Sequence, residues 1–492
     1  MSGGSPGRNN VSPATDVNLA FKPAKTVDVG KNLVWTERLG SLTYGSPVVA
    51  GGRVYIATNN GAEHRKQHKG DRGILLCFDE STGKLNWQLT RQKLEAGKAN
   101  DYPEQGICSS PCVEDDRVYL VTNRAEVMCL DAKGFQDGRN DGVYQTETDK
   151  EELDADILWS IDMFTDLKVY PHFLATCSPV IQGDLVFVMT SNGVSENYDG
   201  IPSPEAPSIL ALNKHSGKVV WQNSIPSTAS RAPAPYNTIL DGQWSSPAVG
   251  EIDGRAQVYM AGGDGVLYAL DAATGELIWW FDLNPKKSEW KLGGRGTRNG
   301  IVATPAFVDR SVVLSVGQDP QNGEGVGHIY RIDATKRGDI SPELVDAQGK
   351  ITANPNSGQI WHYGGNDTDG SITGEKNALL YRRTICTAAI HDGLVLCSDL
   401  SGFLHCLDFE SGKRYWEYDT FAEVWGSPLI VDGRVLLGDA DGELIVVKAG
   451  RELDENEVET IRFGSSIYTT PCVANDRLII AENTRIYAFK IR

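Results

Sequence analysis

The chain has 492 residues, a mass of 53.6 kDa and 40% hydrophobic residues, an ordinary globular composition that excludes a chain disordered throughout. Its 47 basic and 65 acidic residues leave a net charge of −18, which argues against nucleic acid and against an anionic membrane surface as partners. No apolar run approaches the roughly 20 residues that a membrane span requires, so we expect no such span.

Residues 1–32 are predicted to form an extension ahead of the folded domain. They begin Met-Ser-Gly-Gly-Ser-Pro-Gly, without the charged and apolar regions of a secretory signal peptide. We therefore expect either a cytoplasmic protein or a mature chain that has lost such a segment. The nine cysteines are an odd number and cannot all pair within one chain.

An internal repeat follows, and its first half is a hydroxyl residue, a proline and two apolar runs around a polar turn. The first copy starts at Ser46-Pro47, and the period-2 alternation of β-branched and aromatic residues predicts that both runs are strands. Seven further copies start at Ser110, Ser178, Ser246, Thr304, Thr387, Ser427 and Thr470, and Ala388 replaces the proline in one of them.

The second half of the repeat is an apolar run, an Asp, a Thr/Ser-Gly turn and a strand that carries tryptophan. The clearest copy is Ala269-Leu-Asp-Ala-Ala-Thr-Gly-Glu-Leu-Ile-Trp279. The tryptophan position holds Trp87, Trp159, Trp221, Trp279, Trp361 and Trp416, with Ile461 in the seventh copy. The eighth copy ends before this strand, and residues 33–39 supply a matching segment near the N-terminus.

Eight four-stranded units predict a single all-β domain over residues 33–492, an eight-bladed β-propeller. We name the strands of each blade A to D in chain order. Segment 33–39 is expected to supply strand D of the last blade and to close the ring, because closure removes the exposed edges of the sheets.

The repeat at 269–279 resembles the tryptophan-docking repeat of pyrroloquinoline quinone (PQQ)-type eight-bladed propellers, and the resemblance covers about residues 33–492. Segments 243–247, 293–299 and 316–320 are also similar to exported PQQ-like propellers of planctomycetes. The family includes quinoprotein dehydrogenases and cofactor-free scaffolds of outer-membrane protein assembly. The resemblance therefore implies the fold and a periplasmic or other extracytoplasmic location, and it leaves the activity open.

Quinoprotein alcohol dehydrogenases of this family place two adjacent cysteines over PQQ and hold Ca²⁺ with Glu, Asn and Asp. This chain has no adjacent pair, since Cys108 and Cys112 are four residues apart, and it lacks the Cys-x-x-Cys-His of an attached c-type haem. We therefore expect that no cofactor is firmly implied and that PQQ is disfavoured. Other cysteines, such as Cys77, Cys129 and Cys406, occupy small positions of the predicted core.

In a propeller, the connections from strand D to strand A and from B to C lie on one face. Here five D-to-A connections are long, at 89–108, 160–176, 222–244, 280–302 and 362–385, and B-to-C insertions occur at 58–72, 191–207 and 317–327. Loops on a rigid scaffold commonly carry binding sites, so we predict that this face is the contact surface.

One residue per blade, three before the motif proline, should lie near the mouth of the central channel. Tyr44, Trp425 and Tyr468 belong to blades that adjoin around the closed ring, so they predict an aromatic arc, with Trp244 across from it. These rings either form a cup that stacks a planar ligand or pack under the long loops.

Charged side chains are also expected near this mouth. Arg295 and Arg298 lie in the Gly-rich loop that leads into blade 5, where they either clamp a carboxylate or phosphate or form salt bridges within the loop. His172 is a candidate proton carrier or metal ligand, and the alternative is a buried structural histidine.

Closely spaced oxygen donors follow strand C of blade 2, namely Asp131, Asp137, Asn140 and Asp141 among glycine turns. Such donors suit Ca²⁺, although the EF-hand's Glu at the twelfth position is missing. This insertion is either a structural Ca²⁺ site on the face opposite to the aromatic residues or a solvated acidic loop.

The sequence favours a non-catalytic PQQ-like propeller that acts as a binding or scaffolding module of the cell envelope, with another protein as its partner. The alternatives are a PQQ- and Ca²⁺-dependent oxidoreductase and a binder of carbohydrate or of a small planar or anionic ligand at the aromatic mouth. Fold alone does not choose among them.

Overall fold

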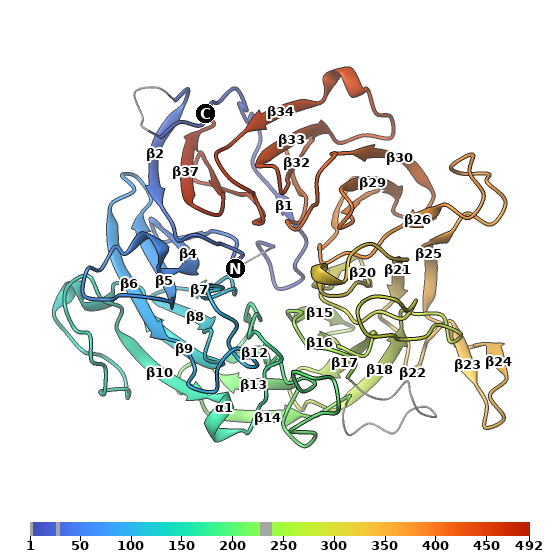
Figure 1. Ribbon diagram of the computed structural model, residues 1–492, viewed down its shortest axis with the longest axis horizontal. Coiled ribbons are helices and arrows are strands. Elements are labelled where there is room, and N and C mark those ends of the chain that lie inside the picture. The colour runs from blue at the N-terminus through green and yellow to red at the C-terminus, as the bar shows by residue number, and fades with distance from the viewer. Residues whose placement is uncertain (1–2, 26–29, 227–238) are drawn as a thin grey trace.

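Eight β-sheets surround a central channel in the computed structural model, which describes residues 3–25, 30–226 and 239–492 (Figure 1). Each sheet is antiparallel across its four blade strands. The eight-bladed β-propeller predicted from the repeats is thus confirmed. No helix in the described part of the chain has the length and apolar content needed to cross a membrane.

The first four blades follow one another along the chain. Blade 1 consists of β3 (Val48–Ala50), β4 (Arg53–Asn59), β5 (Arg72–Asp79) and β6 (Leu85–Gln92). Blade 2 consists of β7 (Cys112–Glu114), β8 (Arg117–Val121), β9 (Glu126–Asp131) and β10 (Ile157–Asp162). Blade 3 consists of β11 (Val180–Gln182), β12 (Leu185–Met189), β13 (Ile209–Asn213) and β14 (Val219–Asn223), and blade 4 of β15 (Ala248–Ile252), β16 (Arg255–Ala261), β17 (Val266–Asp271) and β18 (Leu277–Asp282).

The remaining blades complete the ring. Blade 5 consists of β19 (Ala306–Val308), β20 (Ser311–Ser315), β21 (His328–Asp333) and β25 (Gln359–Asn366), and blade 6 of β27 (Ala389–His391), β28 (Leu394–Ser398), β29 (Phe403–Asp408) and β30 (Arg414–Asp419). Blade 7 consists of β31 (Leu429–Val431), β32 (Arg434–Gly438), β33 (Glu443–Lys448) and β34 (Glu459–Arg462). Blade 8 consists of β35 (Cys472–Ala474), β36 (Arg477–Ala481), β37 (Arg485–Lys490) and β2 (Leu33–Arg38).

Short additional elements decorate the blades. The extra strands are β1 (Val11–Ser12), β22 (Gly338–Asp339), β23 (Glu343–Val345), β24 (Ile351–Ala353) and β26 (Leu379–Tyr381). The helical turns are α1 (Met163–Asp166), η2 (Asn60–Ala62), η3 (Gly134–Asp137), η4 (Pro320–Asn322) and η5 (Glu455–Glu457).

Strand β2 closes the ring as predicted. It pairs antiparallel with β37, with Leu33 opposite Phe489 and Arg38 opposite Arg485. The N-terminal and C-terminal parts of the chain therefore share one blade. The pairing of β2 with β37 covers the edges that these two strands would otherwise leave unpaired.

The tryptophans of the D strands join neighbouring blades. Each indole nitrogen donates to a backbone carbonyl in the C-to-D turn of the next blade: Trp35 to Glu80, Trp87 to Ala132, Trp159 to Lys214, Trp221 to Ala272, Trp279 to Ala334, Trp361 to Phe409 and Trp416 to Gly450. The glycine of the turn is needed at Gly275, because its φ is +74° and an added Cβ would lie 2.6 Å from the Trp221 ring.

The Ser/Thr-Pro motif forms a second set of links, around the channel. Six of the eight motif hydroxyls accept a hydrogen bond from the backbone N–H of the equivalent residue in the preceding blade. Six such bonds of 2.8–3.1 Å involve the hydroxyls of Ser110, Ser178, Ser246, Ser427, Thr470 and Ser46. Proline has no backbone N–H to donate. It suits this position because the first N–H of an inner edge strand has no partner in the sheet.

Part of the predicted N-terminal extension lies inside the channel. Backbone N–H groups of the inner strands of four successive blades donate to it at 2.8–3.0 Å: Val249 to the Pro6 carbonyl, Phe307 to the Gly7 carbonyl, Ile390 to Asn9 Oδ1 and Ile430 to the Asn10 carbonyl. Arg8 is 2% exposed and donates to the carbonyls of Ser178, Pro179 and Pro247. Strand β1 then pairs parallel with β31, so residues 3–12 cover inner edges of blades 3 to 7.

Candidate functional site

We call the face with the D-to-A and B-to-C connections the loop face, and the opposite one the turn face. On the loop face, Tyr44, Trp425 and Tyr468 meet as the sequence predicted for neighbouring blades. Their ring centroids are 5.8 Å apart for Tyr44 and Trp425, 5.8 Å for Tyr44 and Tyr468, and 4.7 Å for Trp425 and Tyr468, and all three pairs are stacked. These separations are those of rings in direct contact, so no planar ligand lies between any two of them.

A second cluster forms around His172 on the loop face. The Trp244 ring stacks on the imidazole with centroids 5.7 Å apart, and its indole nitrogen donates to the His172 carbonyl at 3.0 Å. His172 is fully buried, with Nδ1 2.9 Å from the Val194 carbonyl and Nε2 3.1 Å from Asp241 Oδ1 and 3.2 Å from the Tyr198 hydroxyl.

The hydrogen bonds around His172 fix its protonated ring nitrogen. A carbonyl oxygen only accepts, so Nδ1 of His172 carries a proton, and Nε2 faces the carboxylate of Asp241 and the hydroxyl of Tyr198. Both ring nitrogens are therefore engaged, and the arrangement fixes three connections of the loop face to one another.

Asp319 lies in the B-to-C connection of blade 5, where its Oδ1 accepts a hydrogen bond of 2.9 Å from the Gln321 N–H. Burial and the nearby Asp241 carboxylate raise the pKa of Asp319, which His172 partly opposes. Burial, together with the charges of Asp241 and Asp319, raises the pKa of the Tyr198 hydroxyl. The pKa of Tyr44 is raised mainly by burial, then by Cys108 and Tyr468, with a smaller contribution from Asp319. No local motif of the sequence marks Tyr198, Asp241 or Asp319, so none of the three was predicted as a site residue.

The two arginines of the Gly-rich loop point in different directions. Arg298 is 1% exposed, and its Nη2 donates to Asp282 Oδ1 at 3.1 Å and to the Asp264 carbonyl at 3.0 Å. Although burial opposes it, Arg298 and Lys286 hold the pKa of Asp282 below its usual value. Arg295 is exposed and donates to the Leu292 carbonyl, so the two guanidinium groups do not converge on one ligand position.

The acidic insertion of blade 2 gathers a different set of donors from the one predicted. Oxygen atoms of Asp131, Asp141 and Asp156 lie within 4.8 Å of one another on the turn face. Asp137 accepts a hydrogen bond from the backbone N–H of Arg139, and Asn140 bonds Glu147 and Gln145, so both lie outside this cluster. No sequence motif connects Asp156 with Asp141, which precedes it by fifteen residues.

The cysteines form no disulfide, and all nine lie in the described residues. Burial raises the pKa of Cys77 and Cys108 to about 12, which removes thiolate character. The vicinal cysteine pair of the quinoprotein dehydrogenases has no counterpart here, since Cys112 is buried in the core between blades while Cys108 is half-buried at the channel mouth. The rings of the aromatic cluster stack on one another beside Cys108 and do not form two separate walls.

Large apolar side chains stand exposed on the D-to-A connections of the loop face. They are Tyr102 (40% exposed), Leu292 (45%), Ile372 (47%) and Phe421 (84%). Leu292, Ile372 and Phe421 belong to three successive connections, between blades 4 and 5, 5 and 6, and 6 and 7. The half-buried Trp425 follows Phe421 in the same connection.

The eight blades, the D-strand indoles and the hydroxyl–proline ring define an eight-bladed propeller of the PQQ-like repeat type. The chain belongs to the protein family described as outer membrane protein assembly factor BamB, whose sequence model matches residues 26–134, 205–339 and 348–492. The outer membrane protein assembly factor BamB of Yersinia pestis is 26% identical over 357 residues, 68% of this chain and 78% of that protein.

Two solved structures share the fold. BamB from Moraxella catarrhalis is 15% identical with a TM-score of 0.53, and the match covers 94% of this chain and 97% of that one. A europium-containing methanol dehydrogenase is 12% identical with a TM-score of 0.64, and the match covers 100% and 97%. At these identities the likeness concerns the fold alone.

Proposed function

We propose that this propeller is a non-catalytic scaffold of the cell envelope that holds a protein partner on its loop face. The observation that carries the proposal is the row of exposed apolar side chains Leu292, Ile372 and Phe421 on three successive connections of that face. The family description as an outer membrane protein assembly factor supports an extracytoplasmic location and a role in assembly.

Phe421 is the best candidate anchor for the partner. It is 84% exposed, and its φ of +62° is unusual for a bulky residue. Its ring and the half-buried Trp425 offer aromatic area of the kind that dominates binding energy at protein interfaces. The buried and fully bonded His172 supports a positioning role for the neighbouring polar network, in keeping with a scaffold.

Site-specific photo-crosslinking in cells tests this face. A photoreactive side chain at position 421 or 425 should give a discrete adduct with one partner protein, and Phe421→Ser combined with Trp425→Ala should lower partner recovery about tenfold, which corresponds to about 1.4 kcal/mol. Control positions are Val143 (81% exposed) and Ile351 (39%), which lie in C-to-D insertions on the turn face. Equal adducts at the control positions would contradict the proposal.

Thermal unfolding separates the scaffold from the two alternatives. A scaffold should show no rise in melting temperature with PQQ and Ca²⁺ beyond that with Ca²⁺ alone. A quinoprotein oxidoreductase should be stabilised by PQQ plus Ca²⁺ and should then oxidise a substrate with a dye as acceptor. A binder of small planar ligands, anions or carbohydrates should be stabilised by a member of a ligand panel, with the effect lost in Trp425→Ala.

A further inference from the structure

Three carboxylates converge where the C-to-D insertion of blade 2 meets its strands. Asp131 ends β9, Asp156 directly precedes β10, and Asp141 comes from the loop between them. One oxygen of each lies within 4.8 Å of the other two. Two oxygens that both lie about 2.4 Å from one Ca²⁺ are at most about 4.8 Å apart, so this spacing fits a single ion between them.

Asp156 supplies an independent indication of a ligand. The residue is 1% exposed, and its Oδ2 accepts a hydrogen bond of 2.9 Å from the Asp141 N–H. Its Oδ1 is buried without a hydrogen-bond partner. A buried carboxylate oxygen without a donor is strongly unfavourable, and a bound cation would satisfy it.

The protein provides little positive charge of its own at this place. Within the described ranges, no Lys or Arg forms an ion pair with Asp131, Asp141 or Asp156. The nearest bonded partner of Asp131 is the backbone N–H of Lys133, at 2.6 Å from Oδ1. Three carboxylates at such short separation repel one another unless a cation lies between them.

We propose that Asp131, Asp141 and Asp156 bind one Ca²⁺ ion. All donors are oxygens and three carry charge, which suits a hard divalent cation and not a metal that prefers nitrogen or sulfur. Backbone carbonyls and water would complete the six to eight ligands that Ca²⁺ commonly takes. The proposal keeps two residues of the sequence-predicted set and replaces Asp137 and Asn140 with Asp156.

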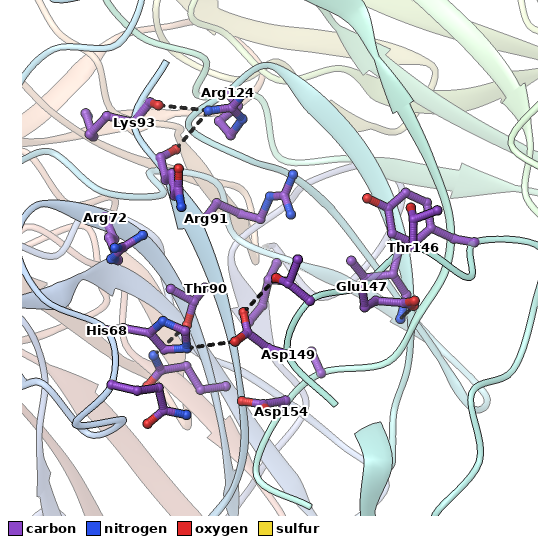
Figure 2. Close-up of a pocket in the computed structure, with 18 of the residues that line it drawn as sticks. His68, Arg72, Thr90, Arg91, Lys93, Arg124, Thr146, Glu147, Asp149 and Asp154 are labelled. Atoms are coloured by element: carbon purple, nitrogen blue, oxygen red, sulfur yellow. Dashed lines mark hydrogen bonds and ion pairs between the residues drawn. The ribbon is translucent and has the colours of Figure 1, made fainter. Parts of the chain in front are cut away.

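The ion would fix one wall of a large cavity. Tyr144 and residues 146–149 follow Asp141 and line a cavity of about 550 Å³ against β6. Figure 2 shows Thr146 and Glu147 on the side of the cavity away from Arg72, and Asp149 beside His68, 3.6 Å from its Nε2. The Val143 N–H donates to the Leu158 carbonyl at 2.9 Å, so Ca²⁺ at Asp141 would hold the loop to β10 at a second point.

Calorimetric titration of the full chain, after treatment with EDTA and its removal, tests the site. Titration with CaCl₂ should show one ion bound per chain, and Asp156→Asn or Asp141→Asn should weaken binding at least about tenfold. Asp137→Asn is the matched control, because Asp137 lies in the same insertion but outside the cluster, and it should bind Ca²⁺ like the wild type.

Melting temperatures in EDTA and in CaCl₂ provide a second test of the site, which applies even if a variant folds poorly. In EDTA, Asp156→Asn should be at least as stable as the wild type, because it removes a repelling charge. In CaCl₂, Asp137→Asn should gain as much melting temperature as the wild type, and the cluster variants should gain less. Absence of Ca²⁺ binding to the wild type, equally tight binding of Mg²⁺, or unchanged Ca²⁺ affinity in both cluster variants would overturn the proposal.

Discussion

Trp279 shows how a single side chain links two blades of the propeller. It is fully buried in strand β18, and its indole nitrogen lies 3.2 Å from both the Ala334 carbonyl of blade 5 and Gln257 Oε1 of blade 4. A packed ring and a hydrogen bond thus act at the same interface. The repetition of this contact around the ring explains why the sequence repeats tryptophan at one spacing.

Replacing Trp279 with Phe should lower the free energy of unfolding by about 1–3 kcal/mol. The change removes the indole N–H that donates to the Ala334 carbonyl and leaves part of the indole volume empty. Urea unfolding measures the effect. Trp290→Phe is the control, since Trp290 is a half-exposed residue of the next connection and its change should cost less than about 1 kcal/mol.

His328 is a residue whose burial makes stability depend on pH. It is 4% exposed, and burial, aided by His362, lowers its pKa to about 3, against the opposing effect of Asp282. The Nδ1 atom of His328 lies 3.0 Å from His362 Nε2. The folded protein therefore keeps this imidazole neutral at a pH where the unfolded chain protonates it.

Stability should fall as the pH drops below about 6.5, because the unfolded chain then binds a proton that the folded chain rejects. At pH 4 this single group should cost roughly 3 kcal/mol relative to pH 7. Urea unfolding between pH 4 and pH 7 should show a flatter profile for His328→Gln than for the wild type. His391→Gln, at an exposed histidine, is the control and should keep the pH dependence of the wild type. If the free energy of unfolding of His328→Gln depends on pH as it does in the wild type, His328 is not the cause of that dependence.

At the scale of elements, segment 3–12 lies in the central channel and belongs to none of the eight repeats. It has neither an apolar period nor a strand pattern, and it contributes carbonyls, the Asn9 side chain and the buried Arg8 to the inner edges of five blades. The inner strands would otherwise present unpaired N–H groups to the channel. The segment thus acts as an inner lining of the ring.

Deletion of residues 1–12 should destabilise the propeller without opening it. The loss of the hydrogen bonds to Pro6, Gly7, Asn9 and Asn10 should cost roughly 2–5 kcal/mol, because water can replace part of them. Strand β2 still closes the ring in this variant, so a cooperative transition at lower temperature is expected in thermal unfolding. Deletion through Arg38 should instead yield an aggregating chain, and equal behaviour of the two deletions would contradict this division of roles.

At the scale of the whole molecule, the repeats made the blades predictable and the loops did not. Strand alternation, the hydroxyl–proline motif and the tryptophan spacing are local signals, and they fix the blade order and the closing strand. The meeting of His172 with Tyr198 and Asp241, and of Asp141 with Asp156, depends on the paths of long connections. Those paths follow from packing between distant segments, which a single sequence does not encode in any local pattern.

The shared last blade also sets the order of events during synthesis. Strand β2 leaves the ribosome before its partner β37, and the strands of the other seven blades emerge between them. The first blades can form in turn, whereas the ring must wait, with the edge of blade 1 toward blade 8 uncovered until the end. Closure of the ring therefore follows synthesis of all eight blades, and a chain of this design would depend on protection from aggregation until β37 is released.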